Sequence, residues 1–227
     1  MAPTPYRTAL IVGAGAGLSA SLARAFAKAG MKIALASRST EDLAGLVSET
    51  GAKAFACDAV KRVDVERLFA AAAKEIGELD VVVYNAGYRT RGPFVELEPA
   101  EVEKTLMVSA FGGFLVAQEA AKRMLPRKSG AILFTGASAS VKGYAQSAPF
   151  AMGKFALRGL AQSLARELSP LGIHVAHFVI DGGIKSARRP DSMLDPDAIA
   201  ASYLHVLAQP RSAWSWEIEL RPWVEKF

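Results

Sequence analysis

Three closely spaced glycines mark the stretch of the sequence best suited to hold a phosphate. Gly13, Gly15 and Gly17 follow the aliphatic run 9–12 and precede a stretch whose apolar residues fall on one helical face. Glycine allows turns and close approaches that a Cβ would prevent. The first turn of a helix presents unpaired N–H groups and a partial positive charge. Because the strand and the helix that this motif requires are both predicted, we favour a nucleotide-phosphate site over a purely structural turn.

The elements that must position this turn alternate between strand and helix along nearly the whole chain. Strands are expected at 9–12, 31–36, 52–57, 79–84, 131–134, 173–180 and 216–220, and helices at 18–30, 40–47, 63–76, 99–125, 150–168 and 196–207. This alternation predicts an α/β fold, with residues 1–227 forming a single Rossmann domain. Its doubly wound parallel sheet of about seven strands would carry helices on both faces. Ligands of such sheets bind at the carboxyl ends of the strands.

Composition narrows the class of protein. The chain has 227 residues, of which 51% are hydrophobic, enough for one sizeable core, and no apolar run approaches the length of a membrane span. The first ten residues lead straight into the first strand, which leaves no room for a signal peptide. A single cysteine, Cys57, fits a reducing cytoplasm. The positive charges exceed the negative ones by five and are dispersed. We therefore expect a cytoplasmic protein that binds neither a membrane nor a nucleic acid.

Histidine and cysteine spacing does not suggest a metal. His174 and His177 are three residues apart in a predicted strand, so their side chains leave opposite faces. His205 lies on the last predicted helix, and the sequence has no Cys/His cluster elsewhere. We predict no metal site.

Several motifs, in the right order, resemble those of the short-chain dehydrogenase/reductase family over almost the whole chain. Residues 12–19 resemble its Thr-Gly-x-x-x-Gly-x-Gly turn, with Ser19 in place of the third glycine. Residues 85–87 match its Asn-Ala-Gly, and residues 181–186 match the Pro-Gly-x-Val-x-Thr segment that clasps the nicotinamide end. Asp58 matches the acid that contacts adenine, and Lys154 the lysine of Tyr-x-x-x-Lys. The resemblance implies cofactor contacts from Gly13, Gly15, Ala16, Gly17, Leu18, Ser37, Arg38, Asp58, Ala59, Asn85, Ala86, Gly87, Lys154, Asp181, Gly182 and Ile184.

The choice of cofactor depends on the charge after the second strand. NAD-binding enzymes place a carboxylate there to bond the ribose hydroxyls. Here the position is Ser37, followed by Arg38, and no acid occurs before Glu41. A guanidinium can bond a 2′-phosphate through two donors, so we favour NADP(H) over NAD(H). The alternative is that Arg38 stacks on the adenine or faces solvent.

The resemblance breaks at the proton donor. Family members use Ser, Tyr and Lys, with the tyrosine passing a proton to or from the substrate oxygen. Here Phe150 stands at the tyrosine position, and a phenyl ring has no proton to give. Residues four apart share a helix face, so Phe150 and Lys154 should still point into one cleft.

The other members of the relay are displaced or altered. The family spacing for the serine lands on Ala137, with Ser138 one residue away and Ser140 three. The family's asparagine corresponds to Ser109. Asp181 replaces the proline of the nicotinamide segment and would bring a carboxylate near that ring.

Two functions from different classes follow. In the first, the protein is a short-chain oxidoreductase that moves hydride between NADP(H) and a carbonyl or alcohol substrate with an altered acid/base. Candidates for that group are Tyr144, Ser138, Ser140, Asp181 and a water held by Lys154. In the second, it is a catalytically inactive dinucleotide-binding protein, either a sensor or a partner subunit. We prefer the enzyme because Lys154 and serines near the expected position remain.

The remaining expectations concern partners and the substrate loop. By resemblance, the helical region 99–125 should pair two copies into a homodimer or a homotetramer. Residues 182–196 are predicted to form a mobile loop. Its part 187–194 is short and polar to basic, which suggests an open cleft around a small-molecule substrate. Arg188 and Arg189 could attract an anionic substrate, although solvated surface charge is the preferred account.

Overall fold

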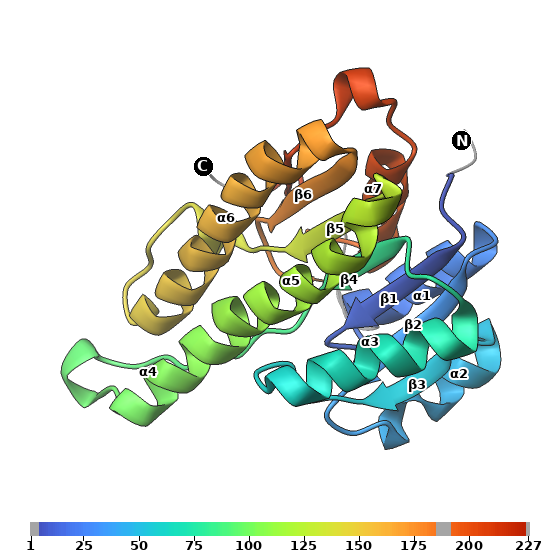
Figure 1. Cartoon of the computed structure of the whole chain (residues 1–227). Coiled ribbons are helices and arrows are strands. Elements are labelled where there is room, and N and C mark those ends of the chain that lie inside the picture. The colour runs from blue at the N-terminus through green and yellow to red at the C-terminus, as the bar shows by residue number, and fades with distance from the viewer. Residues whose placement is uncertain (1–4, 185–191, 226–227) are drawn as a thin grey trace.

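Seven parallel strands form one sheet at the centre of the protein (Figure 1). The computed structural model describes residues 5–184 and 192–225. The strands are β1 (Thr8–Val12), β2 (Lys32–Ser37), β3 (Lys53–Ala56), β4 (Val81–Tyr84), β5 (Gly130–Thr135), β6 (Ile173–Ile180) and β7 (Glu217–Leu220). Their order is β3-β2-β1-β4-β5-β6-β7, so the chain winds outward from β1 on both sides. This is the doubly wound order of a Rossmann fold, and the predicted single-domain α/β architecture is confirmed.

Helices cover both faces of the sheet. On one face lie α1 (Leu18–Lys28), α2 (Ala44–Thr50) and α7 (Pro196–Leu207), and on the other lie α3 (Arg62–Ile76), α5 (Gly112–Met124) and α6 (Ala148–Leu168). Helix α4 (Pro99–Leu106) extends beyond the sheet and contacts α6. Successive strand residues point to opposite faces, so Leu10 packs in one apolar cluster and Ile11 in the other. All residues of β1, β4, β5 and β6 are buried, which explains why these strands are nearly all apolar.

The helical region 99–125, predicted as one stretch, contains a wider turn in its middle. Residues Met107–Phe111 form a π-helical turn between α4 and α5. The Tyr84 hydroxyl, from the end of β4, donates a hydrogen bond to the backbone carbonyl of Val108. A Cβ at Gly112 would lie 2.4 Å from that hydroxyl oxygen. The buried tyrosine therefore occupies space beside the helix and takes a carbonyl out of the regular ladder.

Other element boundaries differ by a few residues. The helix predicted at 40–47 begins as a short 3₁₀ turn, Glu41–Leu43, and continues as α2 to Thr50. Helix α6 starts two residues before the predicted Phe150, because Pro149 suits a first helical turn. Of the predicted mobile loop, 182–184 and 192–196 are described, and Ile184 bridges to Leu194. Lys185, Ser186, Arg188 and Arg189 lie outside the described residues.

No helix in the described part of the chain is long and apolar enough to cross a bilayer. His174 and His177 leave β6 on opposite faces and donate to different partners. Nε2 of His174 donates to the Ser215 carbonyl, and Nδ1 of His177 donates to the Glu217 carboxylate.

Candidate active site

The glycine turn between β1 and α1 is held by contacts that only glycine permits. Gly13 has a φ of +87°, and a Cβ there would lie 2.4 Å from the backbone nitrogen of Ala86. Its carbonyl accepts a hydrogen bond from Nδ2 of Asn85 at 3.2 Å. A side chain at Gly15 or Gly17 would instead meet open space. The turn thus packs its first glycine against the Asn-Ala-Gly segment and leaves the others facing outward.

The start of α1 fits a phosphate group. Gly17 is the residue before the helix, and no side chain caps its first N–H groups. Ala16 and Gly17 are exposed, whereas Leu18 is buried. Ser19 replaces the family's third glycine, and its Oγ accepts from the backbone N–H of Gly15 at 2.8 Å and donates to the Gly15 carbonyl at 3.1 Å. The hydroxyl therefore braces the turn from inside, and the helix opening stays accessible to an anion.

A first cavity, of about 270 Å³, lies beside the ends of β1, β2 and β3. Ser37, Arg38, Asp58 and Ala59 line it together with Gly13. Arg38 is exposed, and Asp58 lies 3.6 Å from the ammonium of Lys61. The Arg38 guanidinium and the Asp58 carboxylate are thus placed where the resemblance expects an adenosine.

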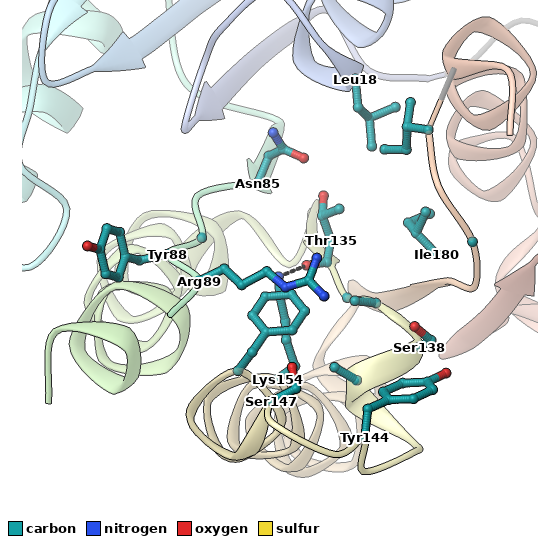
Figure 2. A pocket seen from close by; sticks show the side chains of 17 residues that line it. Leu18, Asn85, Tyr88, Arg89, Thr135, Ser138, Tyr144, Ser147, Lys154 and Ile180 are labelled. Carbon is teal, nitrogen blue, oxygen red and sulfur yellow. Dashed lines mark hydrogen bonds between the residues drawn. The ribbon is translucent and has the colours of Figure 1, made fainter. Parts of the chain in front are cut away.

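A second cavity, of about 440 Å³, lies at the carboxyl ends of β4, β5 and β6 (Figure 2). Leu18, Gly182 and Ile184 line one side of it, and Ser138, Phe150 and Lys154 line another. The two cavities share Asn85, Gly87 and Tyr88. Together the two cavities run along the edge of the sheet from the end of β3 to the end of β6. A dinucleotide would extend over this length.

Lys154 is the buried cation of this second cavity. Its side chain reaches from α6 to the end of β5, where Nζ donates to the backbone carbonyl of Thr135 at 2.8 Å. Only 5% of the residue is exposed. Burial lowers the pKa of the Lys154 ammonium to about 8, because the charged form loses its hydration in the protein interior.

Phe150 lies one helical turn before Lys154 and faces the same cavity. Its ring centre is 5.9 Å from Nζ of Lys154 and 5.0 Å from Cζ of Arg89. Figure 2 shows the Arg89 guanidinium extending over this ring into the middle of the cavity. An aromatic ring thus lies within reach of two cations, both of which its negative faces attract.

The structure separates the two serine candidates. Ser138 lines the second cavity. Ser140 is fully buried outside it, and its Oγ accepts the backbone N–H of Ala137 at 3.1 Å. The hydroxyl of Ser140 thus holds the turn Ser138–Ser140 in place, and Ser138 is the serine that faces the cavity. Ser109 lies in the π-helical turn, where its hydroxyl donates to the Tyr88 carbonyl at 3.4 Å.

Tyr144 lines the second cavity, but it is not next to Lys154. Its side chain is 46% exposed. In Figure 2 its hydroxyl is turned away from the Lys154 ammonium. The ring that lies near that ammonium is Phe150, at 5.9 Å.

Asp181, the carboxylate that the sequence analysis expected near the nicotinamide, is not among the residues that line the cavity. The residue is buried, and its carboxylate pairs with the ammonium of Lys142 at 2.9 Å and the guanidinium of Arg221 at 3.1 Å. Two cations hold the carboxylate as an internal counter-ion between β6, β7 and the loop before α6. The following residue, Gly182, does line the cavity.

Two residues of the site were not singled out from the sequence. The backbone carbonyl of Thr135 accepts the hydrogen bond that fixes Lys154. Any residue type at position 135 could make this contact, so the sequence gives no signal for it. Arg89 lies two residues past the Asn-Ala-Gly segment. Its place after a buried strand, at the same sheet edge as the other candidates, is the signal that would have found it.

Known proteins support this description of the fold. Residues 7–193 match the family model for short chain dehydrogenase. D-threitol dehydrogenase from Mycolicibacterium smegmatis is 31% identical over 74% of this chain and 67% of its own length. Short chain aldehyde dehydrogenase 1 from Euphorbia lathyris is 32% identical over 89% of this chain and 73% of its own.

Solved structures superpose over almost the whole chain. A short-chain dehydrogenase from Rhodopseudomonas palustris is 36% identical, with a TM-score of 0.85 over 96% of this chain and 99% of its own. A metagenomic short-chain oxidoreductase in complex with NADP is 26% identical, with a TM-score of 0.84 over 95% and 97%.

The glycine turn, the sheet order and the lysine that reaches from α6 to the end of β5 together define a Rossmann-type α/β protein. The chain belongs to the short-chain dehydrogenase family.

Proposed function

We propose that the protein is an NADP(H)-dependent oxidoreductase that interconverts a carbonyl compound and its alcohol. The observation that carries this proposal is the continuous edge from Arg38 to Lys154, which has an open helix terminus beside it and a buried ammonium at its far end. When bound, the nicotinamide supplies or accepts the hydride. The NADP in the metagenomic relative and the names of the threitol and aldehyde dehydrogenases support this cofactor and this reaction class.

The residues of the chain would bind, orient and protonate. Arg38 would bond the 2′-phosphate through two N–H groups, and the start of α1 would hold the pyrophosphate. Asp58 and Ala59 would contact the adenosine, and Gly182 and Ile184 the nicotinamide end. Lys154 would bond the ribose hydroxyls, as the resemblance implies, and stabilise a nearby oxyanion.

The proton would come from a group other than the residue at position 150. Ser138 faces the cavity and can donate a hydrogen bond to a substrate oxygen. Lys154, with its pKa lowered to about 8, can hold and orient a water. Tyr144 remains a candidate only if its exposed side chain turns its hydroxyl toward Lys154. A positioned acid contributes about 10²–10⁴ in rate, so turnover without a phenol should be slow.

A second function is favoured by one observation, the phenyl ring beside Lys154. An inactive dinucleotide-binding protein would keep the glycine turn, Asp58, Asn85 and Lys154 and could lose its proton donor without penalty. This alternative predicts tight binding of NADPH with no turnover.

Stopped-flow oxidation of NADPH against a panel of aldehydes and ketones distinguishes the two functions. The enzyme predicts turnover above the enzyme-free rate that falls in Lys154→Ala, and Ser138→Ala and Tyr144→Phe identify the donor. Absence of turnover together with retained NADPH binding favours the inactive protein.

Location and assembly remain predictions. The single cysteine still favours the cytoplasm. Phe111 and Phe114 are 42% and 40% exposed and stack on each other with ring centres 6.1 Å apart, so they do not belong to the core. Their exposure favours helix pairing with a second copy, in a homodimer or homotetramer.

A further inference from the structure

The second cavity has two cations and no anion. Arg89 and Lys154 are both part of its lining, and none of the described lining residues is an aspartate or glutamate. The carboxylates nearby in the fold are engaged elsewhere. Asp181 pairs with Lys142 and Arg221, and Glu101 accepts from Tyr88 and lies 3.6 Å from Lys104. The cavity is therefore electropositive and lacks a counter-ion from the described chain.

Arg89 and Arg158 are bonded differently. Arg158 donates to both carboxylate oxygens of Glu217 at 2.7 Å, so its charge is paired. The described chain gives Arg89 no hydrogen bond or ion pair, and its one ring contact is with Phe150. The guanidinium rests over an apolar surface, with its N–H groups directed to the cavity rather than to a protein acceptor (Figure 2).

The position of Arg89 assigns it to the substrate rather than to the cofactor phosphates. It follows β4 and overlies Phe150 of α6, whereas the phosphate-binding features belong to α1 and the adenosine features to the ends of β2 and β3. Figure 2 places Leu18, the first residue of α1, across the cavity from Arg89.

We propose that the substrate carries a carboxylate and that Arg89 binds it. This inference rests on the proposed function, because it places the anion beside the reacting carbonyl of a bound substrate. A planar guanidinium offers two parallel N–H groups that match the two oxygens of a carboxylate. The face of the Phe150 ring supports the guanidinium. The guanidinium therefore has fewer orientations in the free protein and loses less conformational entropy when the carboxylate binds. One added cation suits a singly charged group better than a phosphate dianion, which usually takes several donors.

Binding to the holoprotein tests this inference without turnover. Acetate, butyrate and benzoate are titrated calorimetrically, at matched ionic strength, into protein saturated with NADPH, and each is compared with its neutral amide. At least one carboxylate should bind about tenfold or more tightly than its amide, the discrimination expected of a charge-assisted bidentate pair. Arg89→Gln should abolish the preference, and Arg89→Lys should keep part of it.

Arg91 provides the matched control. It is exposed in the same segment and does not line the cavity. Arg91→Gln removes the same charge and should leave the preference unchanged. A preference lost equally in both variants would indicate general surface charge and overturn the proposal.

The remaining outcomes separate this inference from the proposed function. NADPH binding without preference for any carboxylate overturns the inference alone, as does a preference that survives in Arg89→Gln. Weakened NADPH binding in Arg89→Gln, with no carboxylate preference in the parent, makes Arg89 a cofactor residue. Failure of NADPH to bind the folded protein overturns both proposals.

A kinetic comparison gives a second readout. With 4-carboxybenzaldehyde and 4-carbamoylbenzaldehyde, the parent should favour the carboxylate in kcat/KM, through a lower KM. Arg89→Gln should raise KM for the carboxylate alone. An equal loss of kcat on both aldehydes would contradict a role in binding the anion.

Discussion

Lys154 donates a hydrogen bond to the Thr135 carbonyl, and this contact fixes its ammonium 5.9 Å from the centre of the Phe150 ring. In the family pattern that the sequence resembles, a tyrosine stands at position 150. The lysine is thus held at the end of β5 by the backbone, independently of any phenol. The cavity retains the arrangement that would act on a phenol, with an apolar ring in its place.

Phe150→Tyr should increase turnover. A phenol at this position would be near the ammonium, which favours its ionised form, and could transfer a proton. We expect kcat for NADPH-dependent carbonyl reduction to rise by about 10²-fold or more. Phe155→Tyr adds the same hydroxyl one turn later, on an exposed position of α6, and should change nothing. Equal rates in the parent and Phe150→Tyr would show that the proton does not limit the reaction.

Lys154→Met should stabilise the folded protein and weaken cofactor binding. The pKa of Lys154 is lowered by burial to about 8, so the folded state bears the cost of the buried charge below pH 8. Between pH 8 and the ordinary lysine pKa the unfolded chain binds more protons, and the stability of the parent rises with pH. The gain from Lys154→Met should therefore be about 1–2 kcal/mol at pH 7 and shrink toward pH 10. Denaturant unfolding at the two pH values measures it, and a gain that grows with pH would contradict the account.

Arg38→Ala should reduce the preference for NADPH. The 2′-phosphate is the group that distinguishes the two cofactors, so the NADPH Kd should rise about tenfold while the NADH Kd stays nearly constant. Lys32→Ala removes an exposed charge from the opposite end of β2 and serves as the control. Parallel changes in both Kd values would assign Arg38 to the adenine or to solvent.

Ser19→Gly should destabilise the protein although it restores the glycine of the family pattern. The change removes both bonds between Ser19 Oγ and the backbone of Gly15. We expect a loss of about 1 kcal/mol beyond the cost of a glycine in the helix. Ser21→Gly, in the same helix and away from the turn, measures that cost. Equal losses in the two variants would show that the Ser19 hydroxyl does not brace the turn.

The sequence was sufficient for the fold because the fold depends on strong local patterns. Strands covered on both faces read as apolar runs, and β4 and β6 are clear examples. The π-helical turn could not be predicted, since its cause is a contact between residues 24 apart, Tyr84 and Val108. The order of the motifs along the chain also placed the glycine turn and the lysine at one edge of the sheet. It could do so because these motifs come near the carboxyl ends of predicted strands.

The direction of side chains in the turns and loops was beyond the reach of the sequence. Ser138 and Ser140 are two residues apart in one short turn, and only the bond to the Ala137 N–H shows which faces the cavity. Asp181 was expected near the nicotinamide, but Lys142 and Arg221 come from distant segments to pair with it. Charge pairing of this kind depends on tertiary contacts that residue spacing does not encode.

Titration of the folded protein with NADPH, followed by calorimetry, tests the central claim most directly. The account predicts one NADPH per chain, bound more tightly than NADH. Absence of binding heat with either cofactor, at two temperatures and on protein shown to be folded by circular dichroism, would contradict it.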